Sequence, residues 1–273
     1  MPTHVDKAGS VDLLRHQFRS LVAVCSSLSD EQWNVATCLP GWSVKDVLSH
    51  IIGTESMLAG VPAPSVDISH LDHMRNGVAE SNEIWVESMR SLSGDELLDR
   101  FGQITGRRLA ALEAMTQADF DAPSWTPVGN DETYGRFMRI RHYDCFMHEH
   151  DIRDALGLPP RLEARDIASA LDEVSTGLGY IVGRRASMPE GSRVRIDLSG
   201  PGSRTFLVQV EGRAAQVESF DQPPTVGVEL PVMMFLRLTG GRVDIQRGGG
   251  GEIGFTGDRR LGEQLVANLA FTI

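Results

Sequence analysis

Hydrophobic residues in the first part of the chain recur at the spacing of amphipathic helices. Steps of three and four residues predict a long first helix, whose apolar face consists of Val11, Leu14, Phe18, Leu21, Cys25 and Leu28. The same periodicity, together with capping residues, predicts further helices near residues 29–33, 44–58, 71–92, 94–115, 135–157 and 163–188. Segments rich in Pro, Gly or Ser, at 59–67 and 122–131, are expected to be loops. Trp42 follows a Pro-Gly turn, and we expect it to plug the end of the core.

Beyond the turn at residues 189–191 the period changes from helical to alternating. The alternation predicts strands at 193–198, 205–211, 214–220, 225–230 and 253–255, with helices at 231–238 and 259–271. We expect this tail to be α+β, a small antiparallel sheet with helices on one face. The glycine run at 248–251 is expected to be a loop tip, because the Lys-Ser/Thr pair of a P-loop does not follow it.

The two patterns together predict the fold class and the domains. The class is mainly α plus α+β, with a helical bundle over residues 1–160 and a smaller α+β domain over residues 161–273. The predicted helix 163–188 bridges the two domains.

Composition narrows the class of protein. The chain has 273 residues, of which 41% are hydrophobic and 23% charged, as in an ordinary soluble protein. A net charge of −11 argues against a nucleic-acid partner, since phosphate backbones are bound by basic surfaces. The chain has no apolar run long enough to span a membrane and no apolar leader at its start, so we expect a cytoplasmic protein without a membrane partner.

The three cysteines, Cys25, Cys38 and Cys145, contain no Cys-x-x-Cys pair, which favours reduced thiols. Cys38 lies in a loop, and a nucleophilic role for it would need a nearby base that the sequence does not identify. No Gly-x-Ser-x-Gly elbow of a hydrolase is present either. The candidate chemistry therefore lies elsewhere.

The chemically distinctive positions are Asp144 and His148. They stand one turn apart on the same face of a predicted helix, within an apolar stripe where unpaired polar groups are costly. A divalent metal bound by both side chains would offset that cost. His50, at the margin of the apolar face of the helix 44–58, is the third candidate ligand. Two other interpretations stay open: a buried Asp–His hydrogen bond that joins two helices, and a histidine at the rim of the core.

The neighbours of these residues are assigned by the same helical geometry. Asp151 lies on the stripe and would either accept a hydrogen bond from a ligating imidazole or cap a neighbouring helix. His142 and His150 point away from it, so we expect both to be solvated and leave them out of the site. Glu149 and Arg153 also point away and are expected to be surface charges.

Two segments carry a family resemblance. Residues 39–50, LPGWSVKDVLSH, and residues 144–157, DCFMHEHDIRDALG, resemble two motifs of the mycothiol-dependent maleylpyruvate isomerase family, within the DinB-like superfamily. The resemblance implies a metal-binding four-helix bundle, with His50, Asp144 and His148 as the metal ligands. The isomerase carries Glu where this chain has Asp144, so the shorter side chain would approach the metal more closely or bind through a water. In the tail, residues 231–240 and 257–258 resemble a sterol-carrier-like C-terminal domain.

The function that the resemblance implies is that of a metal-dependent enzyme. It would use a low-molecular-weight thiol such as mycothiol for isomerisation or S-transfer on a small electrophilic substrate. Zinc is the expected metal, although two imidazoles and one carboxylate also suit nickel, manganese and iron. Arg237 and Arg242 would either hold a substrate carboxylate or serve as surface charge and helix cap. The alternative is a non-catalytic module, stapled by its metal, that binds an apolar ligand through the sterol-carrier-like domain.

Overall fold

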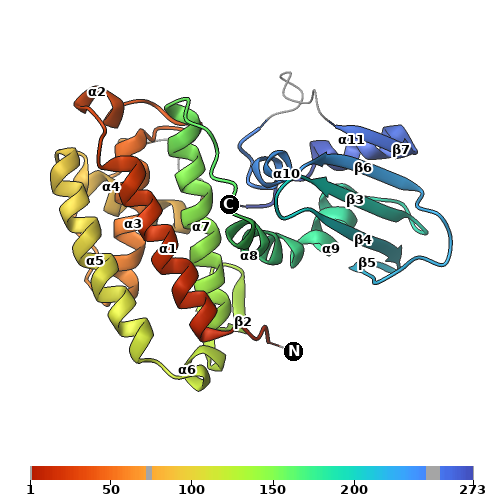
Figure 1. The fold of residues 1–273 in the computed structure, drawn as a ribbon, viewed down its shortest axis with the longest axis horizontal. Coiled ribbons are helices and arrows are strands. Elements are labelled where there is room, and N and C mark those ends of the chain that lie inside the picture. The colour runs from red at the N-terminus through yellow and green to blue at the C-terminus, as the bar shows by residue number, and fades with distance from the viewer. Residues whose placement is uncertain (1, 72–75, 244–252, 273) are drawn as a thin grey trace. The chain divides into compact units, whose positions relative to one another are not determined.

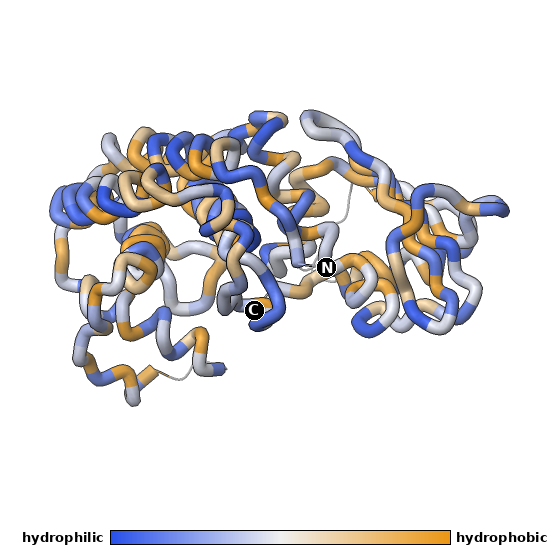
Figure 2. The backbone as a smooth tube through the Cα atoms, turned by 90° about the horizontal axis from the view of Figure 1, so that it is seen from below, coloured by the Kyte–Doolittle hydropathy of each residue, from blue (hydrophilic) through white to orange (hydrophobic). Residues whose placement is uncertain are grey.

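The fold comes from a computed structural model that describes residues 2–71, 76–243 and 253–272. Contacts divide the chain into two compact units, Met1–Arg161 and Leu162–Ile273 (Figure 1). Hydrophobic and hydrophilic residues alternate along the chain in both units (Figure 2). The glycine run 248–251, expected to be a loop tip, lies outside the described residues.

The first unit is built on four long helices. These are α1 (Lys7–Cys25), α3 (Val44–Leu58), α5 (Gly94–Ala114) and α7 (Tyr134–Ala155). Helix α1 packs on α5 and α7, and α3 packs on the same two, so the four enclose one core (Figure 1). Ser43 begins α3 with a capping box to Asp46, as the Ser-x-x-Asp sequence predicts. The core includes Leu14, Leu21, Leu48, Ile51, Phe101 and Leu112.

Three shorter helices complete this unit: α2 (Asp30–Trp33), α4 (Gly77–Met89) and α6 (Gln117–Asp121). Helix α4 is shorter than the predicted helix 71–92, because the side chain of Asn76 caps its start and it ends at Met89. The predicted loop 122–131 was wrong in part. It contains an antiparallel hairpin of β1 (Pro123–Thr126) and β2 (Gly129–Thr133), where Gly129 adopts a φ of 140°.

The second unit begins with α8 (Ala164–Ser175). The predicted helix 163–188 is broken after α8 and continues as α9 (Leu178–Tyr180) and a π-helical turn, η1 (Ile181–Arg185). Close packing accompanies the break, since a Cβ on Gly179 would lie 2.7 Å from the carbonyl oxygen of Ala214.

The remaining strands form one five-stranded sheet of order β5-β4-β3-β6-β7. They are β3 (Arg193–Ser199), β4 (Arg204–Glu211), β5 (Arg213–Gln216), β6 (Val226–Pro231) and β7 (Gly254–Gly257). Neighbouring strands are antiparallel except β3 and β6, which are parallel and pair Ile196 with Val228. Helix α10 (Val232–Thr239) packs against β3 and β6, and α11 (Arg259–Ala267) against β6 and β7. The predicted class, mainly α plus α+β, is confirmed.

Candidate functional site

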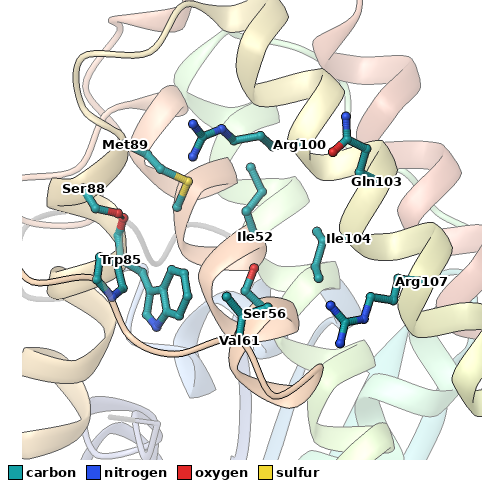
Figure 3. A pocket seen from close by; sticks show the side chains of 11 residues that line it. Ile52, Ser56, Val61, Trp85, Ser88, Met89, Arg100, Gln103, Ile104 and Arg107 are labelled. Atoms are coloured by element: carbon teal, nitrogen blue, oxygen red, sulfur yellow. Dashed lines mark hydrogen bonds between the residues drawn. The ribbon is translucent and has the colours of Figure 1, made fainter.

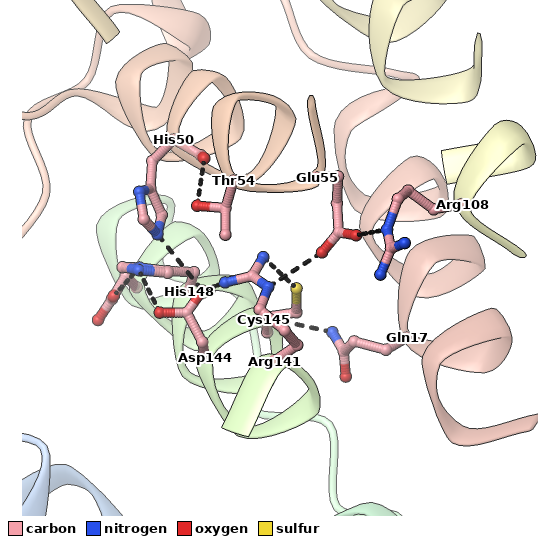
Figure 4. A network of polar contacts seen from close by, with 10 residues as sticks. Gln17, His50, Thr54, Glu55, Arg108, Arg141, Asp144, Cys145 and His148 are labelled. Carbon is pink, nitrogen blue, oxygen red and sulfur yellow. Dashed lines mark hydrogen bonds and ion pairs between the residues drawn. The ribbon is translucent and has the colours of Figure 1, made fainter. Parts of the chain in front are cut away.

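The fold brings His50, Asp144 and His148 together. His50 comes from α3, and the other two come from α7 (Figure 4). The Nε2 atom of His50 lies 3.3 Å from Oδ2 of Asp144, and Nε2 of His148 lies 3.5 Å from Oδ1. The two imidazole centroids are 4.8 Å apart, and one donor atom from each residue falls within 4.8 Å of the others. A carboxylate and two imidazole nitrogens thus face one small volume.

A buried carboxylate orients His148. Nδ1 of His148 lies 2.9 Å from Oδ2 of Asp151, which is 2% exposed. An ionised carboxylate only accepts hydrogen bonds, so Nδ1 of His148 carries a proton and Nε2 is the nitrogen that faces Asp144. The contact expected between Asp151 and a candidate ligand is therefore present. Carboxylates placed behind imidazoles in this way are a common feature of metal sites.

Trp42 orients the second imidazole by packing. Its ring lies 5.2 Å from the ring of His50 and 6.1 Å from that of His148. The indole Nε1–H donates to Oε2 of the buried Glu83 at 2.8 Å, which fixes the plane of the ring. Trp42 was expected to plug the end of the core; it is half-buried and packs against the core cluster, and its ring also lies next to the two histidines. It shields them from water on that side.

The charges of the site depend on Asp144. Burial opposes ionisation of Asp144, but Arg141 and the two histidines hold its pKa well below the usual value. Burial lowers the pKa of His50, which is therefore neutral near pH 7. For His148, burial is outweighed by the charge of Asp144, and its pKa is raised to about 8. In the metal-free protein a proton on His148 thus balances the carboxylate, as a bound cation would.

Arg141 connects the carboxylate of Asp144 to a buried network of charged side chains. Its Nη1 donates to Oδ2 of Asp144 at 2.6 Å, and its Nε donates to Oε1 of Glu55 at 3.0 Å (Figure 4). The other oxygen of Glu55 accepts from Nε of Arg108, also at 3.0 Å. The side chains of Arg141, Glu55 and Arg108 are nearly inaccessible to solvent. The sequence analysis did not predict this network. Arg141 could have been found, because it lies three residues before Asp144 and so on the same face of the helix.

The expectation that His142 and His150 are solvated was wrong. Each is 1% exposed. The helical arithmetic placed them correctly on the side of α7 away from Asp144, but that side is also covered. Nδ1 of His150 lies 2.8 Å from the carbonyl oxygen of Phe146, and Nε2 lies 3.3 Å from that of Arg161.

Glu149 is not a surface charge either, since it is fully buried. Its carboxylate accepts from Gln17 at 2.7 Å and from Ser20 at 2.8 Å, both on α1. Arg153, half-buried and also expected on the surface, donates to it at 2.7 Å, and Arg161 donates at 3.1 Å. Burial opposes the charge, but these donors lower the pKa of Glu149.

Cys38 lies near the site on an exposed loop. Its Sγ is 3.5 Å from Oδ1 of Asp151, so a carboxylate that the sequence could not identify lies beside this thiol. Cys25 and Cys145 are buried. Burial raises the pKa of Cys25 to about 12, and it also raises the pKa of Cys145. Neither buried thiol is a nucleophile near neutral pH.

Comparisons with known proteins now decide the family. Residues 14–153 match the family model described as the mycothiol maleylpyruvate isomerase N-terminal domain, and residues 168–264 match the MDMPI C-terminal domain. The chain belongs to the mycothiol-dependent maleylpyruvate isomerase family. This confirms the resemblance seen in the two sequence motifs.

Two solved structures share the fold. One is a crystal structure of the mycothiol-dependent maleylpyruvate isomerase, 16% identical, with a TM-score of 0.60 over 94% of this chain and 96% of that chain. The other is a mutant of it with a histidine replaced by alanine, 15% identical, with the same TM-score and coverage. No curated protein sequence gives a significant match. Among the described residues, no helix is long and apolar enough to cross a membrane.

Proposed function

We propose that this member of the mycothiol-dependent maleylpyruvate isomerase family is a metal-dependent enzyme. It uses mycothiol, or a closely similar thiol, to isomerise a small electrophilic substrate or to transfer sulfur to it. The single observation that carries the proposal is the convergence of His50, Asp144 and His148, with Asp151 orienting one imidazole. Family membership supports the thiol and an enzymatic role.

The three side chains fit a divalent ion in type and number. Two imidazole nitrogens and one carboxylate suit zinc, which we propose as the metal. Zinc held by His50, Asp144 and His148 would favour the thiolate form of a small-molecule thiol that reached it. The side chain of Asp144 is 28% exposed, so the set is accessible from one side. Trp42 covers the imidazoles and keeps water from them.

The reacting thiol is proposed to come from the small molecule rather than from the chain. Of the chain's three thiols, Cys38 is exposed, whereas Cys25 and Cys145 are buried and their pKa values are raised, so these two remain protonated. Arg141 holds Asp144 ionised and is itself held by Glu55, which keeps the carboxylate ready to bind a cation.

The second unit is proposed to be the sterol-carrier-like domain, over residues 161–273, beside a DinB-like bundle over residues 1–160. The role of Arg237, in the last turn of α10, as a cation for a substrate carboxylate stays a prediction about the second unit. Arg242 was the other candidate. Its guanidinium donates to the carbonyl oxygen of Gly240 at 2.5 Å, which is the helix-end contact anticipated as its alternative role.

Elemental analysis of protein purified without chelator tests the metal site. We expect about one divalent ion per chain, lost in His50→Ala and kept in the matched control His70→Ala, whose side chain is exposed. A native protein without stoichiometric metal, whose thermal stability is also unchanged by His50→Ala, would refute the site. Turnover of electrophilic test substrates with mycothiol and with glutathione then tests the enzyme. Bound metal without turnover on any thiol would mean that the ion only staples the helices.

A further inference from the structure

A cavity lies in the first unit, and the candidate metal ligands do not line it. It has a volume of about 500 Å³ and lies between α3, α4, α5 and the loop that follows α3 (Figure 3). Its apolar wall consists of Ile52, Val61, Pro64, Trp85, Met89 and Ile104. Volumes of this order accommodate small organic ligands.

The charged side chains that line the cavity are all positive. Arg100, Gln103 and Arg107 lie at i, i+3 and i+7 on α5, along one face of the helix, and all three are exposed. None of the lining residues that the structure describes is acidic, although the chain as a whole carries a charge of −11. Arg100 lies toward Met89 and Arg107 toward Val61 (Figure 3). The cavity is therefore complementary to an anion.

Two polar side chains, Arg107 and Ser56, lie at one end of the cavity. Nη2 of Arg107 donates to the carbonyl oxygen of Ala59 at 2.7 Å, which holds the guanidinium beside the cavity with its other donors available. Ser56 lines the same cavity and is only 7% exposed. Its hydroxyl points into the cavity (Figure 3). A ligand oxygen in the cavity would accept a hydrogen bond from this hydroxyl.

We propose that this cavity binds an amphipathic carboxylate, an organic acid with an aromatic or aliphatic body. The body packs on Ile52, Trp85 and Ile104, while Arg107 and the hydroxyl of Ser56 hold the carboxylate. None of His50, Asp144 and His148 lines this cavity, although Trp85 also lines a small hollow beside His50. Binding in the cavity does not depend on the proposed metal chemistry.

Trp85 makes the binding measurable. We expect 4-phenylbutyrate to change the tryptophan fluorescence of the full-length protein saturably, with the same dissociation constant by calorimetry. The neutral counterpart, 4-phenylbutan-1-ol, is expected to bind at least about tenfold more weakly, because it forms no charge-assisted hydrogen bond. The Trp85→Phe protein should lose the fluorescence change and keep the heat of binding.

Matched variants locate the probe. Arg107→Gln is expected to weaken binding about tenfold and Ser56→Ala about threefold. Arg19→Gln, an exposed arginine on α1, is the control and should leave binding unchanged. His50→Ala should also bind the probe normally, which separates this site from the proposed metal site. Equal binding of acid and alcohol, an unchanged affinity in Arg107→Gln, or loss of binding in His50→Ala would each overturn the proposal.

Discussion

Helix α7 carries two buried polar clusters, about one turn apart, that differ in how completely they are satisfied. Around Glu149, neutral and charged donors from α1, α7 and the following turn meet a fully buried carboxylate on both oxygens. Around Asp144, one arginine and two imidazoles meet a carboxylate that remains 28% exposed. The first cluster is closed, and the second is open on one side.

The difference separates a structural cluster from a candidate site. Every charge near Glu149 has an opposite partner within the protein, so adding a ligand would break existing bonds. Near Asp144, the nitrogen lone pair of His148 points at a carboxylate that cannot donate to it, so a proton or a metal has to lie between them. Residue types alone do not distinguish the two clusters. The direction of the lone pairs does.

The largest expected effect comes from opening the closed cluster. Replacing Glu149 with Ala leaves Arg153 and Arg161 without their buried partner, and we expect the free energy of unfolding to fall by about 3–5 kcal/mol. Urea unfolding at pH 7 measures this change. The exposed residue Glu80 is the control, and Glu80→Ala should cost less than about 1 kcal/mol.

Asp144→Asn should show the reverse behaviour. We expect it to abolish stoichiometric metal binding and to cost the metal-free protein less stability than Glu149→Ala, because Arg141 keeps its partner Glu55. If Asp144→Asn destabilised the metal-free protein as much as Glu149→Ala, the contrast between an open and a closed cluster would be wrong.

A smaller effect is expected from the residue behind His148. Asp151→Asn removes the carboxylate that accepts from Nδ1, and metal affinity should fall by about 10–100-fold without loss of the site. Competition with a chelating dye measures the affinity. Asp154→Asn, an exposed carboxylate on the same helix, is the matched control. Equal affinities in the two variants would show that Asp151 does not support the ligand.

The pH dependence of metal affinity tests whether His148 is protonated in the metal-free protein. Its pKa of about 8 means that metal has to displace one proton below that pH, so log affinity should rise by about one per pH unit from 6.5 to 8 and then level off. His50 adds no second proton in this range, since burial lowers its pKa. In metal-free protein the raised pKa stabilises the fold below pH 6.5, and this contribution is lost as the pH rises through 8.

Asp151→Asn sharpens the pH test. Asp151 contributes to the raised pKa of His148, so the variant should level off at a lower pH. An affinity independent of pH between 6.5 and 8 would contradict the assignment of this proton.

The smallest effect is expected for the cysteines: Sγ of Cys145 lies 3.5 Å from Nη2 of Arg141, and Cys25 lies near Glu149. A native chain should react with one equivalent of 5,5′-dithiobis(2-nitrobenzoate), at the exposed Cys38, and with three equivalents after unfolding. Cys38→Ser should leave native protein unreactive. Fast reaction of Cys25 or Cys145 would mean that one of the clusters opens in solution.

Sequence reasoning predicted most helices and strands, because each depends on a local period of apolar residues. It failed where nonlocal packing decides. The break after Ser175 accompanies the close approach of Ala214, and the parallel pairing of β3 with β6 depends on a connection that local alternation does not report.

The candidate site divides in the same way. The sequence by itself determined that Asp144 and His148 share a helical face with Asp151, because a turn of helix fixes the directions of residues three and four apart. Only the tertiary structure decided what meets that face: His50 and Trp42 on one side, and the Arg141–Glu55 pair behind it. It also decided that His142, Glu149 and His150 are buried, since a helix enclosed by other elements has no solvent side there. Direction is a property of the local chain, whereas burial depends on residues far away in the sequence.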